Sequence, residues 1–192
     1  MITILDYGAG NLSSVKNALD YLGMDNSTTD NPKKILSAER IILPGVGSFG
    51  FLMDQLRKKN LEKPLKKAIE KGTPFFGICL GLQALFEESE ESPGVPGLSI
   101  FKGNVQQFRK GKVPQIGWNK IIPEKEGIIQ EGFAYFVNSF VAVPKDPTII
   151  AATSDYYGRY VCAVQWKNIT ATQFHPEKSG DYGLCTLKRW LQ

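Results

Sequence analysis

Residues 74–86 read Pro-Phe-Phe-Gly-Ile-Cys-Leu-Gly-Leu-Gln-Ala-Leu-Phe, and they carry the most informative signals of the chain. Residues 75–78 form a short apolar run, which is typical of a buried parallel strand, and residues 80–86 are apolar at helical spacing. Cys79 lies between them, with a glycine two residues away on each side. A nucleophile at such a strand-to-helix junction has the layout of the G-x-S-x-G elbow, here with sulfur in place of oxygen.

Cys79 therefore has the local setting of a reactive thiol. The tight turn directs the side chain out of the sheet edge, and Gly77 and Gly81 leave room for the neighbouring backbone. The helix N-terminus that follows favours negative charge and presents free N–H groups to an oxyanion. The competing interpretation is that Cys79 is a small buried hydrophobic residue, as most free cysteines are.

The first half of the sequence alternates between strand and helix signals. This alternation indicates a mostly parallel sheet with helices on both faces, in which ligands collect at the carboxyl ends of the strands. Two glycine-rich turns, residues 6–11 and 44–50, lie at that edge together with Cys79. Strands are predicted at residues 1–5, 40–43 and 75–78, and helices at residues 12–22, 52–56, 64–72 and 80–86.

Beyond Leu98 the chain changes character, because its segments become short and rich in β-branched and aromatic residues. They predict mostly antiparallel strands or hairpins, with the turn of the last hairpin at Lys167-Asn168 and a final helix over residues 184–191. The acidic segment 87–96 is interpreted as a solvated surface loop. The predicted strands cover residues 105–108, 114–122, 133–143, 148–153, 160–166 and 169–174.

Length and composition limit the function classes. With 192 residues, 42% of them hydrophobic, the chain can build one sizeable core, and we expect a single domain over residues 1–192. Three cysteines without C-x-x-C spacing and one histidine argue against a disulfide framework or a zinc site, and no metal or cofactor is expected. Residues 1–5 lack the pattern of a signal peptide and no apolar segment is long enough to cross a bilayer, so we expect a cytoplasmic protein without a membrane partner.

The net charge of +4 is mild, and its basic clusters are best explained as solvated helix faces and loops. No aromatic residues alternate with the basic ones, so no nucleic-acid partner is expected. The clusters comprise residues 57–59 with Lys63, Lys66 and Lys67, and residues 109–112.

The last predicted strand leads into Gln-Phe-His-Pro-Glu-Lys at residues 173–178, and His175 is the only histidine of the chain. In an extended segment, residues two apart project to the same side, so Glu177 can hold one ring nitrogen while the other faces a nucleophile. Together with Cys79 these residues would form a thiol–imidazole–carboxylate triad. The competing interpretation is a structural histidine, as most lone histidines are.

Gly-Ile-Cys-Leu-Gly-Leu-Gln at residues 77–83, with His-Pro-Glu at 175–177, resembles the signature of class I glutamine amidotransferases. The resemblance covers essentially the entire chain. It implies an α/β, flavodoxin-like fold with a central, mostly parallel sheet, helices on both faces and antiparallel strands in the C-terminal half. Four more motifs are similar to those of the glutaminase subunits of imidazole glycerol phosphate synthases: residues 6–11, 44–50, 116–119 and 135–137.

The resemblance implies an enzyme that hydrolyses glutamine to glutamate and ammonia. His175 would take the thiol proton, and Cys79 would attack the side-chain amide carbon to give a γ-glutamyl thioester and ammonia. Water activated by His175 would then release glutamate, while Glu177 orients the imidazole and stabilises its cation.

Backbone N–H groups would hold the oxyanion, one from Leu80 and one from the turn that contains Val46 and Gly47. We expect this turn to switch its N–H into the site when a partner is active, since glycine lets a peptide group rotate. Gly45, Gly47 and Gln83 are expected to bind the substrate glutamine. The alternatives are glycines that only close a tight turn and a Gln83 amide on the helix surface.

The resemblance further implies a separate (β/α)₈-barrel cyclase as partner in a heterodimer. This partner would use the ammonia to make imidazole glycerol phosphate and an aminoimidazole carboxamide ribotide in histidine biosynthesis. Asn11, Trp118, Tyr135 and Lys178 match positions that face the partner, although a lysine such as Lys178 is also explained as a solvated side chain.

Two departures from the family pattern leave other functions open. Gln115 and Asn138 stand at positions where the family commonly has histidine. A paralogous glutaminase that feeds ammonia to a sugar amidotransferase is one alternative. A non-catalytic binding subunit of the same fold is another, and the intact triad argues against it. The sequence assigns Cys162 and Cys185 no role beyond packing.

Overall fold

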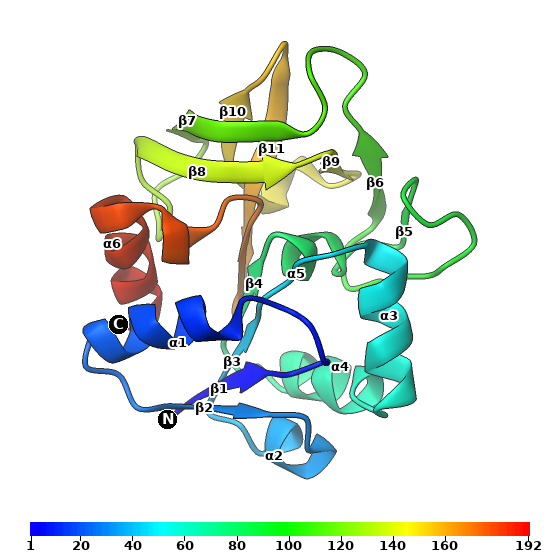
Figure 1. Ribbon diagram of the computed structural model, residues 1–192, viewed down its shortest axis with the longest axis vertical. Coiled ribbons are helices and arrows are strands. Elements are labelled where there is room, and N and C mark those ends of the chain that lie inside the picture. Colours follow the sequence, from blue (N-terminus) through cyan, green and yellow to red (C-terminus); the bar gives the residue numbers. More distant parts are fainter.

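The computed structural model describes residues 1–192, and its centre is a parallel sheet (Figure 1). The strands run in the order β2-β1-β3-β4-β12, and each is parallel to its neighbour. This is the strand order of flavodoxin-like folds, so the predicted fold class is confirmed. The strands are β1 (Ile2–Leu5), β2 (Asn26–Thr29), β3 (Arg40–Leu43), β4 (Phe75–Ile78) and β12 (Ile169–Thr172).

Helices cover both faces of this sheet, as the alternation of signals predicts (Figure 1). One face packs against α1 (Leu12–Tyr21) and α6 (Gly180–Leu191). The other packs against α3 (Phe49–Lys58) and α4 (Glu62–Glu70), and the short α2 (Pro32–Leu36) contacts α4. Alternate strand residues supply the two cores, because successive side chains of a strand point to opposite faces.

Phe75 and Phe76 illustrate this alternation in β4. Both rings are fully buried, Phe75 in the core under α3 and α4 and Phe76 in the core under α1 and α6. The Phe76 ring meets Trp190 of α6 edge-on, with 5.3 Å between the ring centroids. The C-terminal helix is therefore fixed directly onto the strand that leads to Cys79.

The C-terminal half continues the sheet with antiparallel strands, as predicted (Figure 1). After β12 come β11 (Arg159–Trp166), β10 (Ile150–Asp155), β7 (Gln115–Pro123) and β8 (Gly132–Asn138). Three shorter strands lie off this path: β5 (Glu88–Ser89), β6 (Gly103–Gln107) and β9 (Phe140–Pro144). A 3₁₀ turn, η1 (Pro147–Ile149), precedes β10.

Several local predictions are wrong. The strand or hairpin expected over residues 133–143 is two strands that do not pair with each other, since β8 pairs with β7 whereas β9 pairs with β6 and β11. The expected helix over residues 80–86 is only one turn, α5 (Leu80–Gln83). Strand β2 and helix α2 were not predicted, since β2 is polar, although Asn31-Pro32 is a helix-start signal and the Asn31 side chain caps α2.

The acidic segment 87–96 is also more than a solvated loop. It contains β5, and two of its side chains accept hydrogen bonds from the first turn of α3: Glu91 from the Phe49 N–H at 2.6 Å and Ser92 from the Gly50 N–H at 2.9 Å. These bonds satisfy N–H groups that a helix start leaves free. The segment therefore fixes the helix that follows the 44–50 turn.

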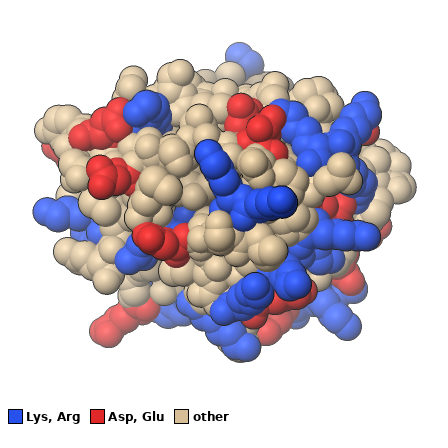
Figure 2. All heavy atoms as spheres, turned by 90° about the horizontal axis from the view of Figure 1, so that it is seen from below, with Lys and Arg blue, Asp and Glu red and all other residues tan.

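Basic and acidic side chains are interspersed on the face seen in Figure 2, which looks at the molecule from below the view of Figure 1. In α4, Lys63 and Lys67 are exposed while Leu65 and Ala68 are buried, as expected of a solvated helix face. None of the helices is both long and apolar enough to cross a membrane.

Replacement of the fully buried Phe76 by alanine tests the packing of α6 on the sheet. We expect Phe76→Ala to lower the free energy of unfolding by about 3–5 kcal/mol, because it removes a large core side chain and its contact with Trp190. Urea denaturation measures this loss. Phe51→Ala is the control, since Phe51 of α3 is 43% exposed and its removal should matter by less than about 1 kcal/mol. Equal losses in the two variants would contradict the described core.

Candidate active site

Cys79 follows β4 directly and occupies a strained elbow. Its φ is +54°, a left-handed value that an L-residue adopts at a cost of about 1–3 kcal/mol. Gly81 comes so close to β3 that a Cβ there would overlap the Leu43 carbonyl oxygen. The Cys79 N–H donates to the Thr172 carbonyl of β12 at 2.7 Å. The elbow is therefore held between its two neighbouring strands.

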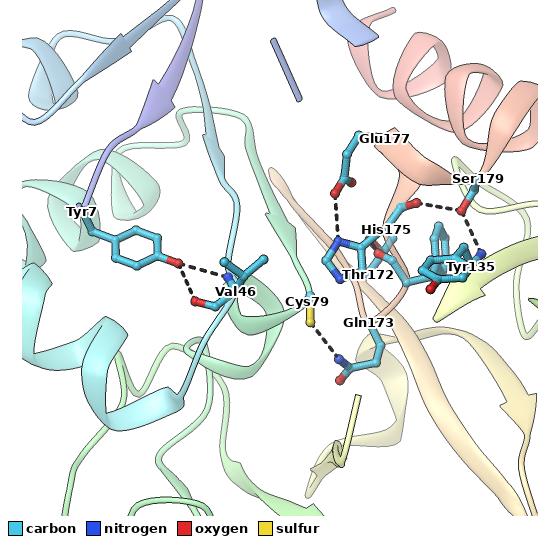
Figure 3. A network of polar contacts seen from close by, with 10 residues as sticks. Tyr7, Val46, Cys79, Tyr135, Thr172, Gln173, His175, Glu177 and Ser179 are labelled. Atoms are coloured by element: carbon cyan, nitrogen blue, oxygen red, sulfur yellow. Dashed lines mark hydrogen bonds and ion pairs between the residues drawn. The ribbon is translucent and has the colours of Figure 1, made fainter. Parts of the chain in front are cut away.

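His175 reaches the same edge because β12 lies beside β4 in parallel register, with Thr172 opposite Ile78. The carboxyl ends of parallel strands meet at one edge of a sheet, so the segments that follow them are neighbours. The His175 N–H donates to the Tyr135 carbonyl of β8 at 3.0 Å. The Ser179 hydroxyl donates to the His175 carbonyl at 2.7 Å and accepts from the Tyr135 N–H at 2.9 Å (Figure 3).

Glu177 holds the His175 ring as expected, with 2.8 Å between Oε1 and Nδ1, and both side chains are 2% exposed. The route differs from the prediction, because Glu177 lies in a 3₁₀ turn, η2 (Pro176–Lys178), and not in an extended segment. His175 Nε2 is buried and has no hydrogen-bond partner in the chain. One ring nitrogen is thus fixed and the other is free for a reacting group.

The environment of His175 favours the imidazolium ion. Burial acts to lower the pKa of His175, but its interactions with Cys79 and Glu177 outweigh burial and raise the pKa to about 10. The His175 ring is therefore protonated at neutral pH.

A chain of buried amides leads to the sulfur. Gln173 Nε2 donates to Cys79 Sγ at 3.5 Å, and Gln83 Nε2 donates to Gln173 Oε1 and to the Phe140 carbonyl, both at 3.1 Å (Figure 3). Gln83 is 3% exposed, so the alternative of a helix-surface amide is wrong. Gln173 was not predicted as a site residue, although its position two residues before His175 near the end of a strand was a usable signal.

Cys79, Gln83 and His175 line one cavity of about 350 Å³. Small-molecule sites have volumes of about 300–1,000 Å³, so the cavity suits a small ligand. A more open depression of about 730 Å³ lies elsewhere and has no cysteine or histidine in its lining. The predicted site residues that line the cavity are Gly45, Val46, Gly47, Cys79, Leu80, Gln83 and His175.

The two expected oxyanion donors differ in their hydrogen bonding. The Leu80 N–H, at the start of α5, has no acceptor within the chain. The Val46 N–H donates to the Tyr7 hydroxyl at 3.1 Å, and the same hydroxyl donates to the Val46 carbonyl at 3.1 Å (Figure 3). Gly47 has a φ of +97°, which glycine adopts without strain. In this conformation the Val46 N–H is committed to Tyr7.

Trp118 and Tyr135, two of the expected partner contacts, form a cross-strand pair of β7 and β8, with 6.1 Å between their ring centroids. Trp118 is 55% exposed. Lys178 is exposed in η2, immediately after Glu177, and half-buried Asn11 precedes α1, which contacts η2. All four residues therefore lie close to the elements that carry His175.

Gln115 and Asn138, the two departures from the family pattern, face each other across β7 and β8 and are both buried. Gln115 Oε1 accepts from the Tyr160 hydroxyl at 2.9 Å, and Asn138 Nδ2 donates to the Phe140 carbonyl at 3.1 Å. Asn138 also lines the cavity. The Gln115–Asn138 pair therefore lies beside Phe140, whose carbonyl also accepts from Gln83.

The other cysteines lie away from the cavity. Cys162 is fully buried in the core of the antiparallel half, where burial raises the pKa of its thiol, and Cys185 is exposed on α6. No group of three or more His, Cys, Asp or Glu side chains is placed to hold a metal ion.

Comparison with known proteins gives a consistent grouping. The family described as glutamine amidotransferase class-I matches residues 3–184. A relative from Pyrococcus furiosus, the imidazole glycerol phosphate synthase subunit HisH, is 46% identical over 98% of this chain and 97% of its own length.

Two further matches add the context of a larger protein and of a solved structure. The chloroplastic imidazole glycerol phosphate synthase hisHF of Arabidopsis thaliana is 42% identical over 100% of this chain but over only 34% of its own length. A crystal structure of a glutamine amidotransferase superposes with a TM-score of 0.81 and 21% identity, covering 100% of this chain and 99% of that chain. At this identity the likeness concerns the fold alone.

The raised pKa of His175 can be measured directly, because the chain has a single histidine. In ¹⁵N-histidine NMR spectra we expect the ring to stay protonated at pH 8 and to titrate toward about 10. Cys79→Ala and Glu177→Gln should each lower the pKa, since each removes an interaction that favours the cation. The stabilisation that this cation contributes is present below the unfolded-state pKa of about 6.5 and is lost as the pH rises through the folded value. An ordinary titration near 6.5 in the unmodified chain would contradict the described pairing.

Proposed function

This chain belongs to the class-I glutamine amidotransferases, in the group of HisH subunits of imidazole glycerol phosphate synthase, and we propose that Cys79, His175 and Glu177 hydrolyse glutamine in it. The observation that carries the proposal is the single cavity onto which Cys79 and the free His175 Nε2 open. Both side chains are buried, and their limited contact with water strengthens the charge interactions in the site.

In the first half-reaction the His175 imidazolium holds the thiol proton and Cys79 attacks the amide carbon of glutamine. The carbonyl oxygen becomes an oxyanion, to which the free Leu80 N–H donates. The carbon–nitrogen bond then breaks, and His175 Nε2 gives its proton to the departing nitrogen. The products of this step are ammonia and a γ-glutamyl thioester on Cys79.

In the second half-reaction the neutral His175 takes a proton from water, and the hydroxide attacks the thioester carbon. The carbon–sulfur bond breaks, glutamate leaves, and the sulfur and the imidazolium return to their starting states. Glu177 keeps Nδ1 protonated throughout by its 2.8 Å contact, so Nε2 is the nitrogen that exchanges protons.

Substrate recognition is assigned to the walls of the cavity. Gln83 Oε1 is buried without a partner, which suits an acceptor for an N–H of the bound glutamine. Gly45 and Gly47 offer backbone groups that line the cavity, and Gly45 packs against Leu80. Gln173 is a positioning residue, because its amide donates to Sγ and is itself held by Gln83.

The ammonia is proposed to pass to a cyclase subunit of (β/α)₈-barrel fold in a cytoplasmic heterodimer, which uses it in histidine biosynthesis. The relatives are named as subunits, and the Arabidopsis relative devotes only 34% of its length to the region matched here, which leaves room for a second activity in that chain. Exposed Trp118 and Lys178, near His175, favour docking over the active-site edge, with Asn11 and Tyr135 beside them. Three free cysteines suit a reducing compartment.

The alternatives from the sequence have less support. The first relatives at 42–46% identity carry the name of the imidazole glycerol phosphate synthase subunit, which disfavours a sugar amidotransferase partner. A strained elbow that places Cys79 in one cavity with a carboxylate-held imidazole has no evident role in a non-catalytic binding subunit, so an enzyme is favoured.

Replacement of the nucleophile Cys79 tests separately the production of ammonia from glutamine and the use of ammonia by the cyclase. In the complex with the cognate cyclase, Cys79→Ala should abolish glutamine-dependent product formation while synthesis from added ammonium salt continues. Cys185→Ala is the control, because this exposed cysteine of α6 lies outside the cavity and its loss should leave both rates unchanged. Glutamine hydrolysis that persists in Cys79→Ala would refute the assignment of the nucleophile.

Trp118 provides a test of the docking edge, which is the proposed partner surface formed by Asn11, Trp118, Tyr135 and Lys178. Trp118→Ala should raise the Kd for the cyclase at least about 30-fold, as loss of a large interface aromatic residue does, and the rate should recover at high cyclase concentration. Tyr21→Ala is the matched control, since Tyr21 is 79% exposed at the far end of α1. Isothermal titration calorimetry measures both constants, and equal Kd values for Trp118→Ala and the unmodified chain would count against this interface.

A further inference from the structure

Tyr7 is a buried residue for which the proposed chemistry has no direct use. It follows β1 and its side chain is fully buried in the core under α3 and α4. Its hydroxyl nevertheless contacts the polar groups of one residue only, accepting from the Val46 N–H and donating to the Val46 carbonyl, each at 3.1 Å. Both peptide groups that flank Val46 are therefore bound by one hydroxyl.

Val46 lines the cavity and Tyr7 does not. In Figure 3 the tyrosine ring and Cys79 lie on opposite sides of Val46. An N–H that donates to the tyrosine oxygen is thus unavailable to an oxyanion that forms on the Cys79 side. Of the Leu80 and Val46 N–H groups, only that of Leu80 has no acceptor within the chain. Loss of one oxyanion donor lowers the rate about 100- to 1,000-fold in other hydrolases.

We propose that the Tyr7 hydroxyl is a latch that holds the turn at residues 45–47 in a resting state, and that its release lets the turn complete the oxyanion site. Rotation of the turn breaks the bonds to Tyr7, and Gly47, with its φ of +97°, supplies a position that tolerates the rotation. The inference rests on the proposed glutaminase function, and Tyr7 is a positioning residue in it.

The latch has a physical connection to the docking edge. Tyr7 belongs to the turn at residues 6–11, which ends at Asn11, one of the proposed partner contacts. A Cβ built on Gly10 would lie 3.8 Å from the Tyr7 hydroxyl oxygen, so the hydroxyl lies near the backbone that leads to Asn11. A partner that displaces Asn11 would therefore move backbone near the latch.

Protonation of the phenol does not control the latch in the physiological range. Burial raises the pKa of Tyr7 to about 12, so the hydroxyl keeps the hydrogen that it donates to Val46. The titratable groups nearest to it, Cys79 and Asp6, both act to raise the pKa further. The bonds between Tyr7 and Val46 are therefore broken by movement of the turn at residues 45–47, not by titration of the phenol.

Tyr7→Phe tests the latch, because it removes the hydroxyl and keeps the buried ring. In the isolated chain we expect the kcat for glutamine hydrolysis to rise about 3- to 30-fold, as the loss of one or two hydrogen bonds of the resting state predicts, with KM changed by less than about 2-fold. In the complex with the cognate cyclase and imidazole glycerol phosphate, the variant and the unmodified chain should have equal kcat values. Tyr182→Phe is the control, since its hydroxyl donates to the Gln130 carbonyl at 2.8 Å and lies outside the cavity.

Amide hydrogen exchange at Val46 gives a readout that does not depend on activity. Exchange at this N–H should be faster in Tyr7→Phe and unchanged in Tyr182→Phe. A basal kcat in Tyr7→Phe that equals or falls below that of the unmodified chain would overturn the latch, and so would unchanged exchange at Val46. If the unmodified chain failed to hydrolyse glutamine in the complex with the cyclase and imidazole glycerol phosphate, the proposed function would be overturned instead. The two failures are therefore distinguishable.

Discussion

Parallel pairing between β4 and β12 is the constraint on which the site depends. It sets Ile78 opposite Thr172, ties the Cys79 N–H to the Thr172 carbonyl, and delivers His175 just beyond the same edge. The chain can return to this position only because the antiparallel half ends in a hairpin whose last strand, β12, inserts beside β4. The C-terminal half is thus both an extension of the sheet and the means by which the imidazole meets the thiol.

The same close packing explains why the site is rigid on one side and adjustable on the other. The cysteine elbow is wedged between neighbouring strands, and Gly81 admits the Leu43 carbonyl where any side chain would collide. The wall formed by residues 45–47 is held by the Tyr7 hydroxyl instead of by a strand. In the proposed latch, the two bonds to Tyr7 are the contacts that a change at the docking edge would have to break to shift this wall.

Much of the fold and the reactive pair was predictable from sequence because strong local signals carry them. Apolar runs marked β1, β3 and β4, and the glycines around Cys79 marked the elbow. Gln173 and Tyr7 escaped prediction, since their roles arise from contacts with a sulfur and a peptide group that are distant in sequence. The break at Ser139 escaped for a related reason: the sequence stays β-like throughout, and only the change of pairing partner from β7 to β6 and β11 ends the strand.

The proposed chemistry depends on one step, in which the Cys79 sulfur, activated by the His175 imidazole, attacks the side-chain amide carbon of glutamine. An electrophilic glutamine analogue with a chloromethyl ketone in place of the amide tests it most directly, with the adduct located by peptide mass spectrometry in the cyclase complex. We expect one adduct per chain, on Cys79, formed much more slowly when His175 is replaced by alanine. An adduct on Cys162 or Cys185, or a rate on Cys79 that does not depend on His175, would contradict it.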